Sequence, residues 1–187
     1  MALVEPHKLL PHEDVNEDNL EKILNIIKIS NSFKPIIVDY NSNVIIDGHH
    51  RWFASRLLKL KRIPVIYIDY TDSRIKVGNW FIKVKNKLLF KKIINNYYSY
   101  IGNICINFDD FKICEESYYK FYWKLYIILQ KFNIIEKSDR EGYKLPEVER
   151  EYIIEIAKRR VVFPAKTTRH SYGFIIPEFT FPLNELL

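Results

Sequence analysis

The segment from residue 35 to residue 70 constrains the fold more than any other part of the chain. Two short apolar runs, 35–39 and 44–46, flank an Asn-Ser-Asn triplet, a pattern typical of two strands joined by a turn. The second run leads directly into an Asp-Gly pair, and helical periodicity follows over residues 49–60. A third apolar run, 63–70, predicts another strand. The segment therefore predicts a mixed α/β unit in which a strand meets a helix N-terminus through a tight turn.

The turn reads Asp47-Gly48-His49-His50-Arg51 and is the strongest local signal for chemistry. The free N–H groups and the dipole of a helix N-terminus attract anions. Gly48 allows a ligand to approach the backbone, while His49, His50 and Arg51 add donors and positive charge. Asp47 places a carboxylate beside this site, which suits a magnesium ligand or a base. The alternative is a plain turn with two surface histidines, but the strand–turn–helix context favours a phosphate site.

Two other segments carry candidate residues. Glu13 precedes a helix predicted over 14–30, where a glutamate either stabilises the helix dipole or acts in catalysis. That helix has a possible capping box formed by Asp14 and Glu17. Near the other end, two hydroxyls, two cations and a histidine stand in consecutive positions, which predicts either a clamp for phosphate or carboxylate or a solvated basic tail. These residues are Lys166, Thr167, Thr168, Arg169 and His170.

The rest of the chain gives weaker signals. Residues 115–132 predict an aromatic-rich helix whose stripe belongs in a core. A further helix is expected over 146–160, with Pro146 in its first turn, and a short strand over 161–163. The tail beyond Phe163 reads as ordered loop.

Composition excludes several classes of protein. Hydrophobic residues make up 48% and charged residues 28%, which is typical of a globular protein and excludes wholesale disorder. Because no apolar run has membrane-spanning length and no signal-peptide core is present, we expect a cytoplasmic protein with no membrane partner. Cys105 and Cys114 are too few for a disulfide framework, so we expect buried thiols. The net charge of +6 admits an anionic partner.

Residues 3–70 resemble the ParB/sulfiredoxin-type domain, and within it the archaeal free L-serine kinase family. The resemblance is carried by LLPHE, NLEKI, PIIVD, VIIDGHHRWFA and IPVIYIDY, and later by Trp80 and the FPAKTTRH segment. Residues 81–144 match poorly. The resemblance implies phosphorylation of free L-serine to O-phospho-L-serine, for cysteine or other amino-acid synthesis. It also implies a nucleotide donor, with ATP favoured over ADP, and Mg²⁺.

The resemblance also implies roles for particular residues. Glu13 stands where the family has its catalytic glutamate, which takes the proton from the serine hydroxyl. The family's phosphate-binding turn matches residues 47–51, so Asp47 and His50 also become candidates for the catalytic step. Lys166 and Thr167 are expected to contact the nucleotide. The expected lining of the serine pocket is Trp80, Thr168, Arg169 and His170.

Two other functions remain as alternatives. A ParB-like nucleic-acid-binding regulator would fit the sequence pI of about 9.1 and the lysine-rich run over 83–92. A nuclease would need a carboxylate cluster, for which Glu13 and Asp47 are the candidates. Sulfinic-acid reduction is excluded because His49 stands where sulfiredoxins carry a cysteine. We therefore expect serine and nucleotide as partners, no nucleic acid, and a monomer or small homo-oligomer.

The expected architecture is a mixed α/β domain, a small sheet flanked by helices. We expect a nucleotide-binding core over 1–80 and a mainly helical second lobe over 81–160. A C-terminal segment, 161–187, is expected to fold back on the active site.

Overall fold

The computed structural model describes residues 2–187, which form two compact units. Unit 1 contains the chain up to residue 76 together with 150–165 and 170–187. Unit 2 contains 77–149 and 166–169. The C-terminal part of the chain is therefore divided between the units, which differs from the three consecutive segments that the sequence predicted.

Unit 1 is built on a four-stranded mixed sheet in which β3 and β5 are parallel and the outer pairs are antiparallel. In spatial order its strands are β1 (Ala2–Val4), β5 (Ile63–Ile68), β3 (Ile36–Asp39) and β4 (Ile45–Asp47). The three strands predicted between residues 35 and 70 are confirmed. The sequence did not predict β1, a three-residue edge strand that pairs with β5.

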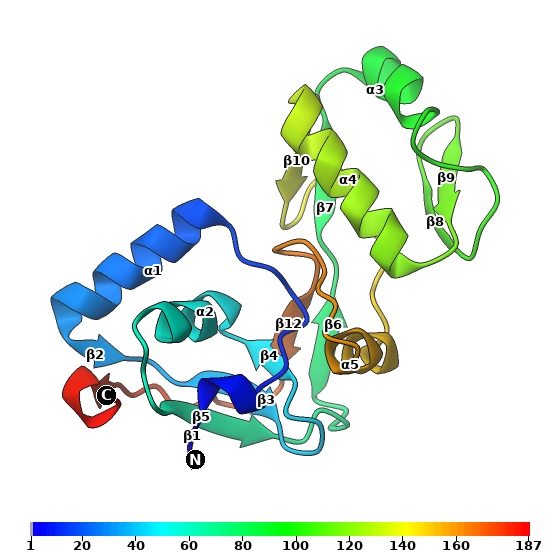
Figure 1. The fold of residues 1–187 in the computed structure, drawn as a ribbon. Coiled ribbons are helices and arrows are strands. Elements are labelled where there is room, and N and C mark those ends of the chain that lie inside the picture. Colours follow the sequence, from blue (N-terminus) through cyan, green and yellow to red (C-terminus); the bar gives the residue numbers. More distant parts are fainter. Residues whose placement is uncertain (1) are drawn as a thin grey trace. The chain divides into compact units, whose positions relative to one another are not determined.

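Two helices, α1 (Glu17–Ser30) and α2 (His49–Leu57), lie on the same side of this sheet (Figure 1). The N-cap of α1 is Asn16, whose side chain accepts a hydrogen bond from the Asn19 N–H at 2.8 Å. The predicted capping box is therefore wrong, because the Asp14 carboxylate accepts the N–H of its neighbour Val15 instead.

The core of unit 1 lies between these helices and the sheet. Its apolar members come from both helices, from β3 and β5, and from the two ends of the chain. The C-terminus is held there because the backbone N–H of Lys61 donates to the Leu186 carbonyl at 2.9 Å. The fully buried members include Phe33, Ile36, Val38, Ile45, Ala54, Ile63 and Val65.

The remaining elements of unit 1 are short. Helix α5 (Arg150–Lys158) begins four residues after Pro146, so the prediction that this proline starts the helix is wrong. The predicted strand over 161–163 is reduced to a single bridge between Phe163 and Glu13. The tail contains β13 (Phe181–Pro182), which pairs with β2 (Ser32–Phe33). The 3₁₀ turns are η1 (Pro6–Lys8) and η2 (Leu183–Glu185). Strands β6 (Ile75–Gly78) and β12 (Arg169–Tyr172) form a two-stranded sheet, and each strand has residues in both units.

Unit 2 combines two helices with a three-stranded sheet and a hairpin, whereas the sequence predicted a mainly helical segment. In the sheet, β7 (Phe81–Val84) lies between β10 (Ile135–Ser138) and β11 (Tyr143–Lys144). The hairpin is β8 (Ile104–Asn107) and β9 (Lys112–Glu115), and the helices are α3 (Lys87–Ile94) and α4 (Tyr118–Phe132). From the aromatic stripe of α4, Phe121 and Tyr122 are buried as expected.

Cys105 and Cys114 form a disulfide across the β8–β9 hairpin, so the prediction of two buried thiols is wrong. The two cysteines stand directly opposite each other in the register, with Cα atoms 4.1 Å apart, and Cys105 is exposed. Sequence spacing does not reveal hairpin register, which is why this pairing escaped prediction.

The lysine-rich run over 83–92 is largely neutralised within unit 2. Four of its lysines form ion pairs with carboxylates that are remote in sequence. The pairs are Lys83–Glu141, Lys85–Glu136, Lys87–Asp109 and Lys91–Asp110. Separately, none of the helices within residues 2–187 has the length and apolar character that crossing a membrane requires.

Candidate active site

The predicted strand–turn–helix is present, with Gly48 as the N-cap of α2. Gly48 has φ +99°, a conformation that residues with a side chain rarely adopt. A Cβ atom added there would lie 2.7 Å from Ile36 Cγ2. The turn therefore requires glycine for both its backbone conformation and its packing.

Asp47 and Arg51 flank this glycine and form an ion pair, with 2.8 Å between Arg51 Nη2 and Asp47 Oδ2. Arg51 also donates from Nη1 to the Pro35 carbonyl at 2.8 Å, which fixes its guanidinium beside the turn. Asp47 is exposed and Arg51 is half-buried. The turn thus presents one carboxylate and one oriented cation next to the first N–H groups of α2.

A cluster of three histidines lies behind the turn. The ring centroid of His12 is 4.4 Å from that of His49 and 5.9 Å from that of His170. The backbone N–H of His12 donates to His49 Nε2 at 3.4 Å, and His12 Nδ1 lies 2.8 Å from the Ile45 carbonyl oxygen. His170 Nε2 lies 2.6 Å from the Tyr70 hydroxyl. The fold therefore brings together three histidines from distant parts of the chain.

Burial keeps these histidines neutral. Loss of hydration lowers the pKa of His49 to about 3 and the pKa of His170 to about 4, and it holds the pKa of His12 well below its usual range. His49 and His170 lower the pKa of His12 further, and His170 also lowers that of His49. The expectation that His49 adds positive charge to the turn is therefore wrong, since its ring faces inward and accepts the His12 N–H.

Glu13 and His50 lie close to this cluster in the chain and are both half-buried. The Phe163 N–H donates to the His12 carbonyl, and the Asp14 N–H donates to the Phe163 carbonyl, each at 2.8 Å. These two bonds hold the backbone on both sides of Glu13. His50 Nε2 accepts the Asn16 N–H at 3.3 Å, which ties the start of α2 to the start of α1.

A cavity of about 290 Å³ lies beside the turn and is lined in part by Asp47, Arg51 and Tyr172. The Tyr172 hydroxyl is buried without a hydrogen-bond partner among the described residues. Burial and the nearby Asp47 carboxylate raise the pKa of this hydroxyl, so it stays protonated. Sequence analysis missed Tyr172, because nothing in the local pattern distinguishes it from the other 12 tyrosines.

Three of the four residues expected to line the serine pocket lie together in unit 2. Trp80 donates from Nε1 to the Thr168 carbonyl at 3.1 Å, and the Arg169 guanidinium lies 5.4 Å from the Trp80 ring centroid. The fourth, His170, belongs to the histidine cluster of unit 1. Lys166 is exposed and Thr167 is buried, both in unit 2. The clamp over 166–170 stays a prediction.

No group of three or more histidine, cysteine, aspartate or glutamate side chains that could hold a metal ion occurs within residues 2–187. Magnesium in nucleotide sites commonly uses one or two protein carboxylates together with the phosphates of the substrate. The exposed Asp47 carboxylate at the turn fits that requirement, although its ion pair with Arg51 would have to rearrange.

Comparison with known proteins places the chain in a family. Residues 1–77 match the ParB N-terminal domain. The chain is 35% identical to a ParB-like protein of Sulfolobus acidocaldarius, over 94% of this chain and 92% of that protein. It is 30% identical to an ATP-dependent L-serine kinase of Staphylothermus marinus, over 99% of this chain and 90% of that protein. The chain therefore belongs to the ParB-fold family that contains the archaeal free serine kinases.

Solved structures agree on the fold. A free serine kinase in complex with AMP superimposes with a TM-score of 0.77 at 22% identity, covering 100% of this chain and 93% of that one. In contrast, a probable chromosome-partitioning protein of Xylella fastidiosa is 32% identical over only 75 residues, which is 24% of its length. The likeness to partition proteins is thus confined to a domain, whereas the likeness to the serine kinase extends over the whole chain.

Proposed function

We propose that this protein is an L-serine kinase that transfers the γ-phosphoryl group of ATP to free L-serine. The observation that carries the proposal is the similarity over 99% of the chain to an ATP-dependent L-serine kinase. ATP is taken as the donor because the relative that matches over nearly the whole chain is an ATP-dependent kinase. Cytoplasmic location is part of the same proposal.

Glu13 is the proposed general base. Its carboxylate takes the proton of the serine hydroxyl, the hydroxyl oxygen forms a bond to the γ-phosphorus, and the bond from that phosphorus to the bridging oxygen breaks. ADP leaves with the electron pair. The backbone bonds on both sides of Glu13 support this role, because a base must be held within hydrogen-bond reach of the acceptor.

The turn is the proposed phosphate site. The N–H groups at the start of α2 and the Arg51 guanidinium bind phosphate oxygens, and Gly48 lets them approach the backbone. His50 is assigned to the same phosphates, while His49 packs behind the turn as a neutral side chain. Magnesium bound with the nucleotide would neutralise phosphate charge, and Asp47 is the carboxylate assigned to it.

Residues of the C-terminal segment are assigned to the substrates. Arg169 is assigned to the serine carboxylate, because a guanidinium binds a carboxylate through two parallel hydrogen bonds. Trp80 and Thr168, which contact each other, and His170 are also assigned to serine. Lys166 and Thr167 are assigned to the nucleotide.

Phosphorus NMR tests the proposal. Protein, magnesium and L-serine are incubated with ATP or with ADP, and the expected result is a new phosphomonoester signal that coincides with added O-phosphoserine in the ATP sample. A signal with ADP alone would overturn the donor assignment. No signal with either donor, from protein that is folded by circular dichroism, would overturn the kinase assignment.

The role of Glu13 is tested separately with Glu13→Gln. General-base catalysis typically contributes about 10²–10⁴-fold, so turnover should fall by about that factor while the KM for ATP changes little. Glu17→Gln is the matched control, because Glu17 lies in the first turn of α1 and contributes to the helix dipole instead. Equal activity of the two variants would rule out Glu13 as the base.

A further inference from the structure

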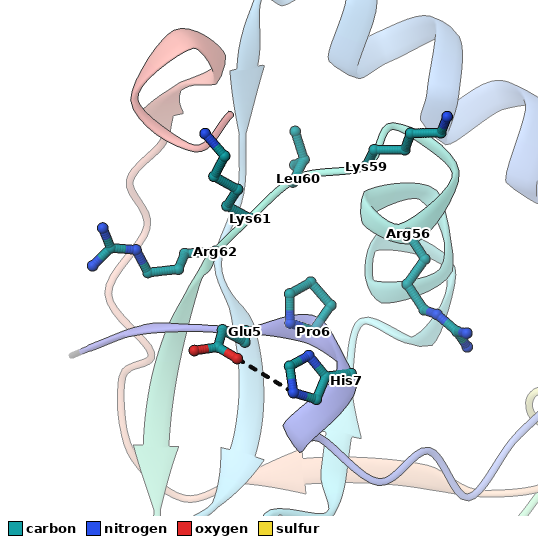
Figure 2. A pocket seen from close by; sticks show the side chains of 8 residues that line it. All are labelled: Glu5, Pro6, His7, Arg56, Lys59, Leu60, Lys61 and Arg62. Atoms are coloured by element: carbon teal, nitrogen blue, oxygen red, sulfur yellow. Dashed lines mark ion pairs between the residues drawn. The ribbon is translucent and has the colours of Figure 1, made fainter.

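A second, larger hollow lies at the opposite end of α2 from the turn. Its volume is about 680 Å³, and Figure 2 shows its lining side chains. Most of them come from the C-terminal end of α2 and from the loop that leads into β5, and the others come from the segment around η1. The lining residues are Glu5, Pro6, His7, Arg56, Lys59, Leu60, Lys61 and Arg62.

Four of these residues are exposed cations within a stretch of seven positions, namely Arg56, Lys59, Lys61 and Arg62. None of the four forms an ion pair with another described residue. This distinguishes them from four of the five lysines over 83–92, which have acidic partners. We call this group the α2–β5 basic hollow.

The negative charge in the hollow is already compensated. Glu5 is its one carboxylate, and it forms ion pairs with Lys8 at 3.1 Å and His7 at 3.3 Å. The hydrogen bond from Lys8, followed by its charge, lowers the pKa of Glu5. The charge of Arg62 also contributes to this lowering, but Glu5 forms its ion pairs with His7 and Lys8, which lie outside the group of four.

The backbone that carries these cations is well held. Lys59 has φ +56°, and the Leu60 N–H closes the turn by donating to the Ser55 carbonyl at 3.0 Å. The N–H groups of both Lys61 and Arg62 donate to the Leu186 carbonyl. The hollow is therefore a defined surface of unit 1 and does not depend on the position of unit 2.

Figure 2 shows that the cationic heads extend outward around the hollow in different directions instead of converging on its centre. A compact anion can contact only convergent donors, whereas an extended chain of phosphates can contact donors spread around a rim. We propose that the α2–β5 basic hollow binds the sugar–phosphate backbone of a nucleic acid. Arg56 and Arg62 offer planar guanidinium groups to phosphate oxygens, and the lysines contribute point charges.

This inference differs from the sequence-based expectation of no nucleic-acid partner. That expectation was based on the lysine-rich run over 83–92 and did not take this hollow into account. It does not depend on the serine kinase assignment. A membrane surface is disfavoured because the apolar residues that line the hollow, Pro6 and Leu60, are both buried.

The test measures fluorescence anisotropy of short labelled single-stranded RNA, single-stranded DNA and duplex DNA at increasing salt. Four phosphate contacts predict a slope of log K against log salt of about −3 for single strands and about −3.6 for a duplex. Lys61→Glu combined with Arg62→Glu should weaken binding at least about tenfold and reduce the slope by about half. Comparing the three probes identifies the type of nucleic acid.

Lys22→Glu combined with Lys28→Glu is the matched control, since it makes the same change in net charge on α1 without altering the hollow. Equal weakening by the two double variants would overturn the proposal in favour of a general charge effect. The proposal would also be overturned if folded wild-type protein bound none of the three probes at low salt. The same holds if the protein bound inorganic tripolyphosphate and none of the nucleic acids. Serine kinase activity should be the same in both double variants, which separates this test from that of the proposed function.

Discussion

Replacing Gly48 by alanine tests how strictly the turn between β4 and α2 is specified. The change adds one methyl group at a position with φ +99°. That methyl group would lie 2.7 Å from Ile36 Cγ2 and 3.0 Å from Arg51 Nη2. Ile36 is fully buried in β3 and belongs to the core of unit 1, so moving it would disturb that packing.

Three contributions set the expected loss of stability. A left-handed conformation costs a residue with a side chain about 1–2 kcal/mol. Forcing an extra methyl group into a packed site costs about 1–3 kcal/mol. The lower conformational entropy of alanine in the unfolded chain returns about 0.4–1 kcal/mol. The free energy of unfolding should therefore fall by about 1–4.6 kcal/mol, a large share of the typical total.

Urea unfolding followed by far-ultraviolet circular dichroism measures this change. The midpoint should move to lower urea with no change in slope, because the mutation alters stability and not the surface exposed on unfolding. Gly78→Ala is the control, since the nearest atom to its added Cβ lies 3.4 Å away. If Gly48→Ala unfolds at the wild-type midpoint, the argument that only glycine fits this turn is refuted.

Two further predictions concern buried histidines and the disulfide. The pKa values of His49 and His170, about 3 and about 4, lie below those of unfolded histidine, so the unfolded state binds more protons under acidic conditions. The free energy of unfolding should be highest above pH 6.5 and fall as the pH drops toward 4, with a loss of about 2 kcal/mol per histidine by pH 5. Equal urea midpoints at pH 7.5 and pH 5 would contradict the buried, neutral cluster. Replacing both Cys105 and Cys114 by serine removes a crosslink between residues nine positions apart and should lower the stability of unit 2 by about 2–3 kcal/mol. Mass spectrometry after alkylation checks the wild-type protein, and two free thiols under non-reducing conditions would contradict the pairing.

Local patterns identified the parts of the fold whose signals lie in adjacent residues. The strands over 36–39 and 45–47, the Asp-Gly turn and the start of α2 were all predicted, because apolar runs, turn residues and helical periodicity follow one another without interruption. Helix ends were predicted less well. Asn16 and not Asp14 caps α1, because several polar residues in a row can each serve as a cap and the local sequence does not select one.

Contacts between distant residues left no comparable signal. The hydrogen bond between Tyr70 and His170 joins residues 100 positions apart, and the one between His12 and His49 joins residues 37 apart. Burial makes His49 neutral, although its residue type and its place beside Arg51 in the sequence favoured a positive charge.

The sequence alone therefore established the strand–turn–helix and its likeness to a kinase family, because both depend on the order of neighbouring residues. Tertiary structure alone decided the charge at each site. Four of the five lysines over 83–92 form ion pairs with carboxylates of unit 2. Arg56, Lys59, Lys61 and Arg62 form no ion pair among the described residues. The physical reason is that protonation and ion pairing depend on hydration and on neighbours in space, and the folded chain sets both.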